Sequence, residues 1–410
     1  MSRWRHQVPV RSPLSVRALL AGARAAIGSR NGHEAERVVG LLYERYAPRD
    51  VLLTESGTAA LIAALRAILE NRPSAPIAIP AYACYDLATV ANGAGASAFL
   101  YDVDPHTLAP DLAQIEAALR AGAAAVVVAH LYGYPVDVRE VSRLAAETGA
   151  VVIEDAAQAA GATLHGRRAG SWGSLSVLSF SRGKGLTGGS GGALMARDEA
   201  GARVLQRARM LLGEPRRGWK ELIAVAAQLL LEHPSVYAIP AALPFLRLGE
   251  TIYREPGPLR APAVAANAMI AATWTLADHE VQLRRRNAER LLEAVQGQPD
   301  LAPIRAAAGA QPGYLRLPVF ASPAARRAAT ERGARRLGIM PGYPKALCDL
   351  DRFTASCVNR EATWPGARAL ANRLCTLPTH SGLDGDDFEG LESWIRTCAS
   401  GVRDEHARRA

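Results

Sequence analysis

The chain has 410 residues, enough for one large or two ordinary domains, and 49% of them are hydrophobic, which is normal for a soluble protein. Its net charge of +9 is spread along the sequence without the interleaved basic and aromatic residues of nucleic-acid binders, so we expect no nucleic-acid partner. The cysteines form no Cys-x-x-Cys pair and the histidines are scattered, which argues against a disulfide scaffold or a metal site and suits a reducing cytoplasm. The basic N-terminus has no continuous apolar stretch, so we expect no signal peptide.

Strands and helices are predicted to alternate between residue 51 and about residue 200. Helical spacing predicts helices at residues 56–69, 111–122 and 137–149. Apolar stretches predict strands at residues 76–80, 96–104, 124–131, 150–157, 174–181 and 191–197. The alternation predicts an α/β fold in which helices sandwich a mostly parallel central sheet. Such sheets bind ligands beyond the carboxyl ends of their strands, and Glu154, Asp155 and the loop around Lys184 fall at or near such ends.

Residues 201–260 break this alternation. Within them the stretch "ELIAVAAQLLLEHPSVYAIPAALPFLRLGETIY" is strongly apolar, but polar residues and prolines interrupt it. No run reaches the roughly 20 apolar residues that a membrane-spanning helix needs. Two interpretations remain open for residues 222–249. The stretch is buried in a subunit interface or over the site, or it lies on a membrane surface.

The rest of the chain predicts a smaller domain. A helical stretch begins at about residue 262, strands are predicted at 314–320 and 373–380, and a closing helix is predicted at 386–400. We therefore expect an N-terminal arm and helical segment at 1–50, a large α/β domain at 51–260 with an apolar insertion at about 220–250, and a small C-terminal α+β domain at 261–410.

Residues 56–58 and Asp155 are the first two candidates for chemistry. Ser56, Gly57 and Thr58 open a predicted helix, whose free N–H groups and dipole can hold a phosphate, although an ordinary N-cap has the same sequence. Asp155 follows an apolar strand, where a carboxylate can face a ligand or cap the next turn, and Gln158 can point the same way.

Lys184 is the third candidate, and it lies in the loop "SFSRGKGLTGGSGG". A lysine that is desolvated among small residues can attack a carbonyl and form a Schiff base, although a flexible surface loop has the same composition. Ser179 and Ser181 can supply hydroxyls to a phosphate. Together, a phosphate cradle, an acid after a strand and a lysine in a glycine-rich loop are what pyridoxal phosphate needs for its phosphate, its ring nitrogen and its aldehyde.

At this point the sequence resembles the DegT/DnrJ/EryC1/StrS sugar aminotransferases, which are pyridoxal-phosphate (PLP) enzymes of fold type I. The resemblance covers most of the chain from about residue 50 to residue 395. Its most specific blocks are "IEDAAQAAGA" and "SFSRGKGLTGGSGG", and it extends to "ESGTAAL", "IPAYACYDLATVANGAG" and "TLPTHSGLDGDDFEGLESWI". It implies the fold-type-I fold, the cofactor PLP and a homodimer.

The resemblance also implies a role for each candidate. Lys184 matches the lysine that binds the cofactor aldehyde and then moves the proton, and Asp155 matches the partner of the pyridine nitrogen. Gln158 matches the contact to the phenolic oxygen of the ring. Ser56, Gly57, Thr58 and Ser179 match the phosphate ligands. The family stacks an aromatic ring on the pyridine where this chain has Cys84, and Tyr82 or Tyr85 on either side is the alternative.

The chain departs from the family a second time near residue 258. The family usually has a Gly-Asn-x-Arg segment whose asparagine reaches the phosphate of the partner subunit, but here Pro258 takes its place while Arg260 remains. The resemblance implies an aminotransferase that moves an amino group from glutamate or glutamine to a keto sugar, nucleotide-linked, for a polysaccharide or a secondary metabolite. A lipid-linked or membrane-proximal sugar would explain the apolar stretch at 222–249. The alternatives are a sugar dehydratase, which would have histidine in place of Lys184, and a non-catalytic binding or regulatory protein.

Overall fold

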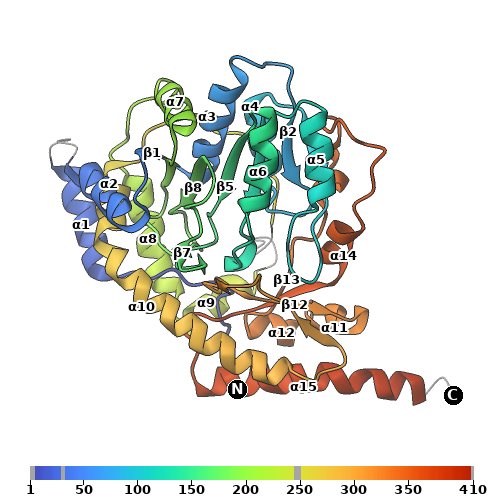
Figure 1. The fold of residues 1–410 in the computed structure, drawn as a ribbon. Coiled ribbons are helices and arrows are strands. Elements are labelled where there is room, and N and C mark those ends of the chain that lie inside the picture. Colours follow the sequence, from blue (N-terminus) through green and yellow to red (C-terminus); the bar gives the residue numbers. More distant parts are fainter. Residues whose placement is uncertain (1–4, 29–32, 244–250, 408–410) are drawn as a thin grey trace.

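The computed structural model describes residues 5–28, 33–243 and 251–407 of the chain (Figure 1). Its helices are α1 (Val16–Ile27), α2 (His33–Tyr46), α3 (Gly57–Leu69), α4 (Asp86–Ala94), α5 (Leu112–Arg120), α6 (Arg139–Thr148), α7 (Glu199–Arg209), α8 (Trp219–Leu231), α9 (Pro234–Ala241), α10 (Val264–Val295), α11 (Pro323–Ala328), α12 (Arg332–Arg336), α13 (Asp351–Thr354), α14 (Pro365–Arg373) and α15 (Gly385–Ala407). Its strands are β1 (Asp50–Thr54), β2 (Ile77–Pro80), β3 (Ala98–Tyr101), β4 (Ala125–Ala129), β5 (Val151–Asp155), β6 (Thr163–Leu164), β7 (Arg167–Arg168), β8 (Leu175–Ser179), β9 (Gly192–Ala196), β10 (Leu301–Pro303), β11 (Ala310–Gln311), β12 (Leu317–Ala321), β13 (Met340–Pro341) and β14 (Leu374–Leu377).

The central sheet has seven strands in the order β1-β9-β8-β5-β4-β2-β3. The five strands from β8 to β3 in this order are parallel, and β9 runs antiparallel to both of its neighbours. Helices cover both faces of the sheet (Figure 1). This confirms the predicted α/β fold with a mostly parallel central sheet, and the carboxyl ends of β5 and β8 are neighbours because these strands are paired.

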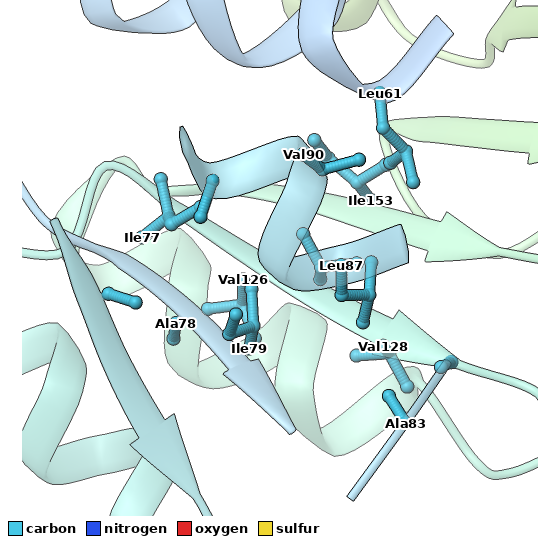
Figure 2. Close-up of a cluster of buried hydrophobic side chains, with 14 of the residues drawn as sticks. Leu61, Ile77, Ala78, Ile79, Ala83, Leu87, Val90, Val126, Val128 and Ile153 are labelled. Carbon is cyan, nitrogen blue, oxygen red and sulfur yellow. The ribbon is translucent and has the colours of Figure 1, made fainter. Parts of the chain in front are cut away.

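The core lies between this sheet and helices α3 and α4. Alanines and leucines in α3 are almost all buried, which suits a helix that packs on a sheet of β-branched residues. Figure 2 shows side chains of α3 and α4 against those of β2, β4 and β5, namely Leu61, Leu87, Val90, Ile77, Ile79, Val126, Val128 and Ile153. Burying each of the larger side chains contributes about 1.5–3 kcal/mol, so this core fixes the strand ends that carry the candidate residues.

Helix α10 connects the central sheet region to a second, smaller sheet. It packs against α1 and α2 on one side and against α15 and β10 on the other (Figure 1). The second sheet has the antiparallel order β10-β12-β14-β13. Its core includes Leu317, Val319, Leu377 and Ile395. Strands therefore occur within the predicted ranges 314–320 and 373–380, and the predicted closing helix occurs as well. The division into an N-terminal arm, a large domain and a small C-terminal domain stays a prediction.

The apolar segment predicted at 222–249 forms helices α8 and α9 over its described residues, and residues 244–249 lie outside the described part. Leu222 and Val225 of α8 are buried against α1 and α10. No single described helix has both the length and the apolar composition to cross a bilayer, whereas α8 and α9 reach them together as a pair bent by 109°. Helix α4 was not among the elements predicted from the sequence.

Candidate active site

A cavity of about 480 Å³ opens at the carboxyl ends of the parallel strands. It is lined by most of the predicted cofactor-binding residues: Ser56, Gly57, Thr58, Cys84, Asp155, Gln158, Ser179 and Lys184. These residues come from segments that are up to 128 positions apart, between Ser56 and Lys184. The fold therefore brings the three predicted groups to one place, as the interpretation of the sequence required.

The N-terminus of α3 forms one end of the cavity. Ser56 caps the helix, with its Oγ accepting from the N–H of Ala59 at 3.0 Å. Within the described residues, no hydrogen-bond acceptor lies on the N–H group of Thr58, whereas the backbone at Gly57 takes part in the bridge between Ser56 and Gly191. A Cβ atom at Gly57 would lie 3.0 Å from the Cβ of Ser179, so glycine allows this close approach to β8. The arrangement leaves the N–H of Thr58 and the positive end of a helix dipole at the cavity, which suits an anion such as a phosphate.

The loop that follows β8 holds Lys184 against the rest of the site. A Cβ atom at Gly185 would lie 2.2 Å from the Cβ of Ala160, so the residue after Lys184 packs without space for a side chain. The N–H of Gly183, on the other side, donates to Ser12 Oγ of the N-terminal arm at 3.1 Å. Lys184 is half-buried and forms no ion pair within the described residues. Gly185 thus serves close packing, Gly183 adopts a left-handed φ of 74°, and the loop is anchored on both sides of the lysine.

Glu154 and Asp155 are the last two residues of β5. Because side chains alternate along a strand, these two point to opposite faces of the sheet. Glu154 is fully buried and accepts from His130 Nε2 at 2.8 Å, from the N–H groups of Gly170 and Gly173 at 2.7 and 2.6 Å, and from that of Trp172. His130 Nδ1 accepts from the N–H of Val136, so its proton lies on Nε2. Burial opposes ionisation of Glu154, yet these hydrogen bonds hold the pKa of its carboxyl below the usual value.

Asp155 accepts fewer hydrogen bonds than Glu154 within the described residues. Its Oδ1 accepts from the N–H of Ala157 at 3.1 Å, and its carboxylate faces the cavity. Desolvation raises the pKa of Asp155, and the positive charge of Lys184 opposes that rise. A half-buried carboxylate in this situation is stabilised by a ligand group that carries a positive charge or an N–H.

Gln158 is held by hydrogen bonds at both ends of its amide. Its Oε1 accepts from the N–H of Tyr132 at 2.9 Å, and its Nε2 donates to the hydroxyl of Tyr343 at 2.6 Å. Tyr132 and Tyr343 are stacked, with ring centroids 5.6 Å apart. Tyr132 also has a φ of 57°, a left-handed conformation that is rare for an aromatic residue and that clusters at functional sites.

The three candidates for the stacking position take different places. Cys84 lines the cavity, and burial raises the pKa of its thiol to about 12, so it is a neutral, soft surface. Tyr82 and Tyr85 are buried away from the cavity, and each hydroxyl accepts a backbone N–H of the small-sheet region, from Tyr343 at 3.0 Å and Lys345 at 2.8 Å. Both tyrosines thus hold the segment of Tyr343 in place, and Cys84 is the one of the three that can face a bound ring.

Pro258 also lines the cavity, at the place where the family has an asparagine. Proline has no backbone N–H and no side-chain donor, so it cannot replace that asparagine as a phosphate ligand. Arg260 is tied to the site through its backbone, because its carbonyl accepts from the N–H of Glu55 at 3.0 Å.

A second cavity of about 710 Å³ adjoins the first and shares Cys84, Gln158 and Lys184 with it. Its other walls come from the N-terminal arm, α8, α9 and the small-sheet region, and they include Pro9, Gln228, Tyr237, Arg316 and Tyr343. The apolar insertion therefore lies over the site in its described part, which agrees with one of the two interpretations of its sequence. Reasoning from the sequence missed Arg316 and Tyr343, because each lies in a part that reads as ordinary strand or loop.

The fold and this cavity define the class of the protein. A mostly parallel sheet with a lysine on the loop after β8 and an aspartate at the end of β5 is the arrangement of fold-type-I PLP enzymes. The fold agrees with that of a solved sugar aminotransferase: CalS13 from Micromonospora echinospora matches with a TM-score of 0.71 at 22% identity, over 95% of this chain and 98% of that chain.

Sequence comparisons identify the family. The DegT/DnrJ/EryC1/StrS aminotransferase family matches residues 23–226. An L-glutamine:2-deoxy-scyllo-inosose aminotransferase of Streptoalloteichus tenebrarius is 31% identical over 299 residues, which is 72% of this chain and 65% of that protein. A UDP-N-acetyl-3-dehydro-α-D-glucosamine 3-aminotransferase of Acidithiobacillus ferrooxidans is 39% identical over 144 residues, or 35% of this chain and 39% of that protein. The chain belongs to the DegT/DnrJ/EryC1/StrS family, and its matches span about two fifths to two thirds of the length of these curated relatives.

Proposed function

We propose that the protein is a PLP-dependent aminotransferase that transfers an amino group from glutamate or glutamine to a keto sugar. The observation that carries the proposal is the single cavity in which Lys184, Asp155 and the N-terminus of α3 meet. The residues fit the cofactor, because among the described residues Asp155 has no charged partner in contact other than Lys184, and the N–H of Thr58 has no acceptor. Bound PLP would supply an electron sink for the carbon that gains or loses the amino group.

Each residue has a task in this proposal. The N-terminus of α3 and the hydroxyls of Ser56, Thr58 and Ser179 would hold the phosphate. Asp155 would keep the pyridine nitrogen protonated, a role that its placement at the end of β5 supports. Gln158 would contact the phenolic oxygen, with its amide oriented by Tyr132 and Tyr343.

Lys184 would hold the cofactor and then move a proton at its Nζ in both half-reactions. Its two neighbours are glycines that pack closely or bond to Ser12, so the lysine side chain moves while its backbone stays in place. The lysine also argues against a sugar dehydratase, which would have histidine at this position.

The relatives support the choice of substrate class. One acts on a nucleotide-linked keto sugar and another takes its amino group from L-glutamine for an inosose, according to their names. We propose a nucleotide-linked keto sugar as acceptor, in the formation of a polysaccharide or a secondary metabolite. We also propose that the protein is cytoplasmic and forms a homodimer. Size-exclusion chromatography with light scattering tests the homodimer directly.

Contact with an anionic membrane through α8 and α9 is a further part of the proposal. Ile223, Leu230 and Ile239 are 71%, 69% and 68% exposed, and Trp219 is 51% exposed. Lys220 is exposed between them, whereas the acid of this helix, Glu221, is buried. An exposed apolar surface with positive charge suits anionic lipids. Flotation with anionic liposomes is expected to carry the wild-type protein upward and to leave an Ile223→Asp, Leu230→Asp variant in the soluble fraction, and a wild-type protein that stays soluble contradicts this part.

The experiment that tests the function follows the cofactor through both half-reactions. Protein loaded with PLP is expected to lose its visible absorption when L-glutamine or L-glutamate is added, and to regain it when the correct keto sugar follows. A panel of keto sugars then identifies the acceptor. A protein that binds PLP but whose absorption responds to no amino donor contradicts the proposed activity.

A further inference from the structure

The described part of the N-terminal arm before α1, residues 5–15, forms no helix or strand and makes part of the wall of the second cavity. That cavity is lined by Lys184 and by three residues of the arm, Val8, Pro9 and Val10. An irregular segment cannot pair its backbone groups within a helix or a sheet, so its hydrogen-bond partners show what holds it in place. In this arm they come from the small-sheet region, from α10 and from the loop of Lys184.

Three side chains that are almost fully buried bind carbonyl groups of the arm. Arg316, before β12, donates from its Nη1 to the carbonyl of residue 9. Arg284 of α10 donates from its Nη2 to the carbonyl of residue 11 at 2.6 Å. His380, after β14, donates from its Nε2 to the carbonyl of residue 8 at 2.8 Å, because its Nδ1 accepts a backbone N–H. Hydrogen bonds from charged donors are roughly twice as strong as neutral ones, so the arm is firmly attached to the small-sheet region and α10.

The end of the arm binds the loop of Lys184. Ser12 is 0% exposed, and its Oγ accepts from the N–H of Gly183 at 3.1 Å. Gly183 directly precedes Lys184 and has a φ of 74°, so the backbone makes a left-handed turn immediately before the lysine. In the part of the chain that the structure describes, no other hydrogen bond is made by the backbone of residues 182–184.

A lysine between two glycines needs such a fixed point. Glycine has the greatest backbone freedom of all residues, and Gly183 and Gly185 flank Lys184. The lysine side chain is itself a flexible four-carbon chain, so the place of its Nζ depends on where the main chain is held. A misplacement of about 1 Å at a reacting group can lower a rate about 100-fold. The packing of Gly185 fixes the main chain after the lysine, and Ser12 fixes it before the lysine.

We propose that Ser12 is a positioning residue for Lys184: its hydroxyl holds the N–H of Gly183 and thereby keeps the lysine where its Nζ reaches the cofactor aldehyde. Ser12 lines neither cavity, so it acts through the loop and not through contact with a ligand. The attached arm carries this constraint from the small-sheet region to the loop. The proposal rests on the proposed aminotransferase function and adds to that site a residue that is more than 170 positions away in sequence.

The test compares two forms of the cofactor by calorimetry. PLP has the aldehyde that binds a lysine, whereas pyridoxamine phosphate has an amine in its place and forms no bond with Lys184. Ser12→Ala removes one hydrogen bond from the lysine loop, so it is expected to weaken PLP binding about 5-fold and to leave pyridoxamine phosphate binding within about 2-fold of wild type. In a Lys184→Ala protein, the added Ser12→Ala change is expected to have no effect on PLP binding.

Ser15→Ala is the matched control. Ser15 lies in the same arm, and its Oγ accepts from the N–H of Ala18 at 3.2 Å as the cap of α1. The change therefore removes the same kind of hydrogen bond without a contact to the lysine loop. It is expected to bind both cofactor forms within about 2-fold of wild type, because the loss of a cap acts on the stability of the helix.

Hydrogen exchange on the wild-type protein, resolved to single amides, needs no variant to fold. The amide of residue 183 is expected to exchange at least about 10-fold more slowly than those of residues 182 and 184, because it alone is hydrogen-bonded. An equal loss of affinity for both cofactor forms in Ser12→Ala, unchanged affinity for both, or an amide at 183 that exchanges as fast as its neighbours would overturn the proposal. Failure of the aminotransferase function shows separately, as cofactor absorption that no amino donor changes while PLP still binds through Lys184.

Discussion

The region around Glu154 and the cavity around Asp155 lie at the same strand end, yet the fold treats their carboxylates in opposite ways. Glu154 receives hydrogen bonds from His130 and from three backbone N–H groups, whereas Asp155 receives one, from Ala157. The pKa of Glu154 is lowered and that of Asp155 is raised. A carboxylate that the fold satisfies by itself is structural, and one that the fold leaves unsatisfied in a cavity awaits a ligand.

The same distinction separates Arg284 from Arg316. Arg284 is paired with Glu280 inside the fold, whereas Arg316 faces neutral acceptors in the wall of a cavity. We therefore identify candidate binding residues as charged groups in a cavity wall to which the fold supplies too few hydrogen bonds or no opposite charge. The predictions that follow test this idea in order of expected effect.

Replacing Glu154 is expected to give the largest loss of stability. Glu154→Ala leaves the Nε2–H of His130 and the N–H groups of residues 170, 172 and 173 buried without an acceptor, at a cost of about 3–5 kcal/mol in the free energy of unfolding. Denaturant unfolding of the cofactor-free protein measures it. A loss below about 1 kcal/mol means that the hydrogen-bond network around Glu154 is not structural.

Replacing Asp155 is expected to act in the opposite direction on stability. Asp155→Asn removes a desolvated charge, so we expect the cofactor-free protein to gain stability while its affinity for PLP falls about 10-fold or more. Thermal unfolding and fluorescence titration with PLP measure the two effects. A variant that loses stability and keeps its PLP affinity shows that Asp155 is structural, like its neighbour.

The dependence of stability on pH is expected to have opposite slopes for the two residues. The folded-state pKa of Glu154 lies below its ordinary value of 4.5, so its contribution is present above pH 4.5 and is lost as the pH falls through the lowered pKa. The folded-state pKa of Asp155 lies above its ordinary value of 3.8, so stability decreases as the pH rises from 3.8 through the raised pKa. Comparing Glu154→Gln and Asp155→Asn with wild type between pH 3 and pH 7 isolates each slope, and slopes of the same sign contradict the comparison.

The cap of α3 is expected to give the smallest effect. Ser56→Ala removes the acceptor for the N–H of Ala59 and is expected to cost about 0.5–2 kcal/mol of stability. Because the N–H of Thr58 and the helix dipole remain, we expect PLP affinity to fall only a few-fold. Ser56→Asn, which keeps a capping oxygen, serves as the control and is expected to restore most of the stability.

The sequence predicted the site where its residues lie on regular elements with clear periodicity. Asp155 follows an apolar strand and Lys184 follows another, and the pairing of β5 with β8 places these ends together. The family resemblance chose Asp155 over Glu154, whereas the strand pattern alone could not separate them. The physical reason for the choice is visible only in the structure, where Glu154 accepts hydrogen bonds from residues 170–173.

Contacts between distant segments explain the remaining failures. Tyr82 and Tyr85 flank Cys84 in sequence, yet their hydroxyls bind the backbone of Tyr343 and Lys345, about 260 positions away. Arg316 precedes an apolar strand and becomes part of the site only because the N-terminal arm and β14 enclose it. No local pattern carries that information, because it depends on how the two sheets and the arm pack together.

The most direct test of the central claim uses the small number of lysines in this chain, which are Lys184, Lys220 and Lys345. Protein incubated with PLP is reduced with borohydride, which fixes the cofactor to its lysine, and the modified peptide is identified by mass spectrometry. We expect stoichiometric modification at position 184, the same result in Lys220→Ala and Lys345→Ala proteins, and none in Lys184→Ala. Modification at position 220 or 345 with position 184 left free would contradict the account.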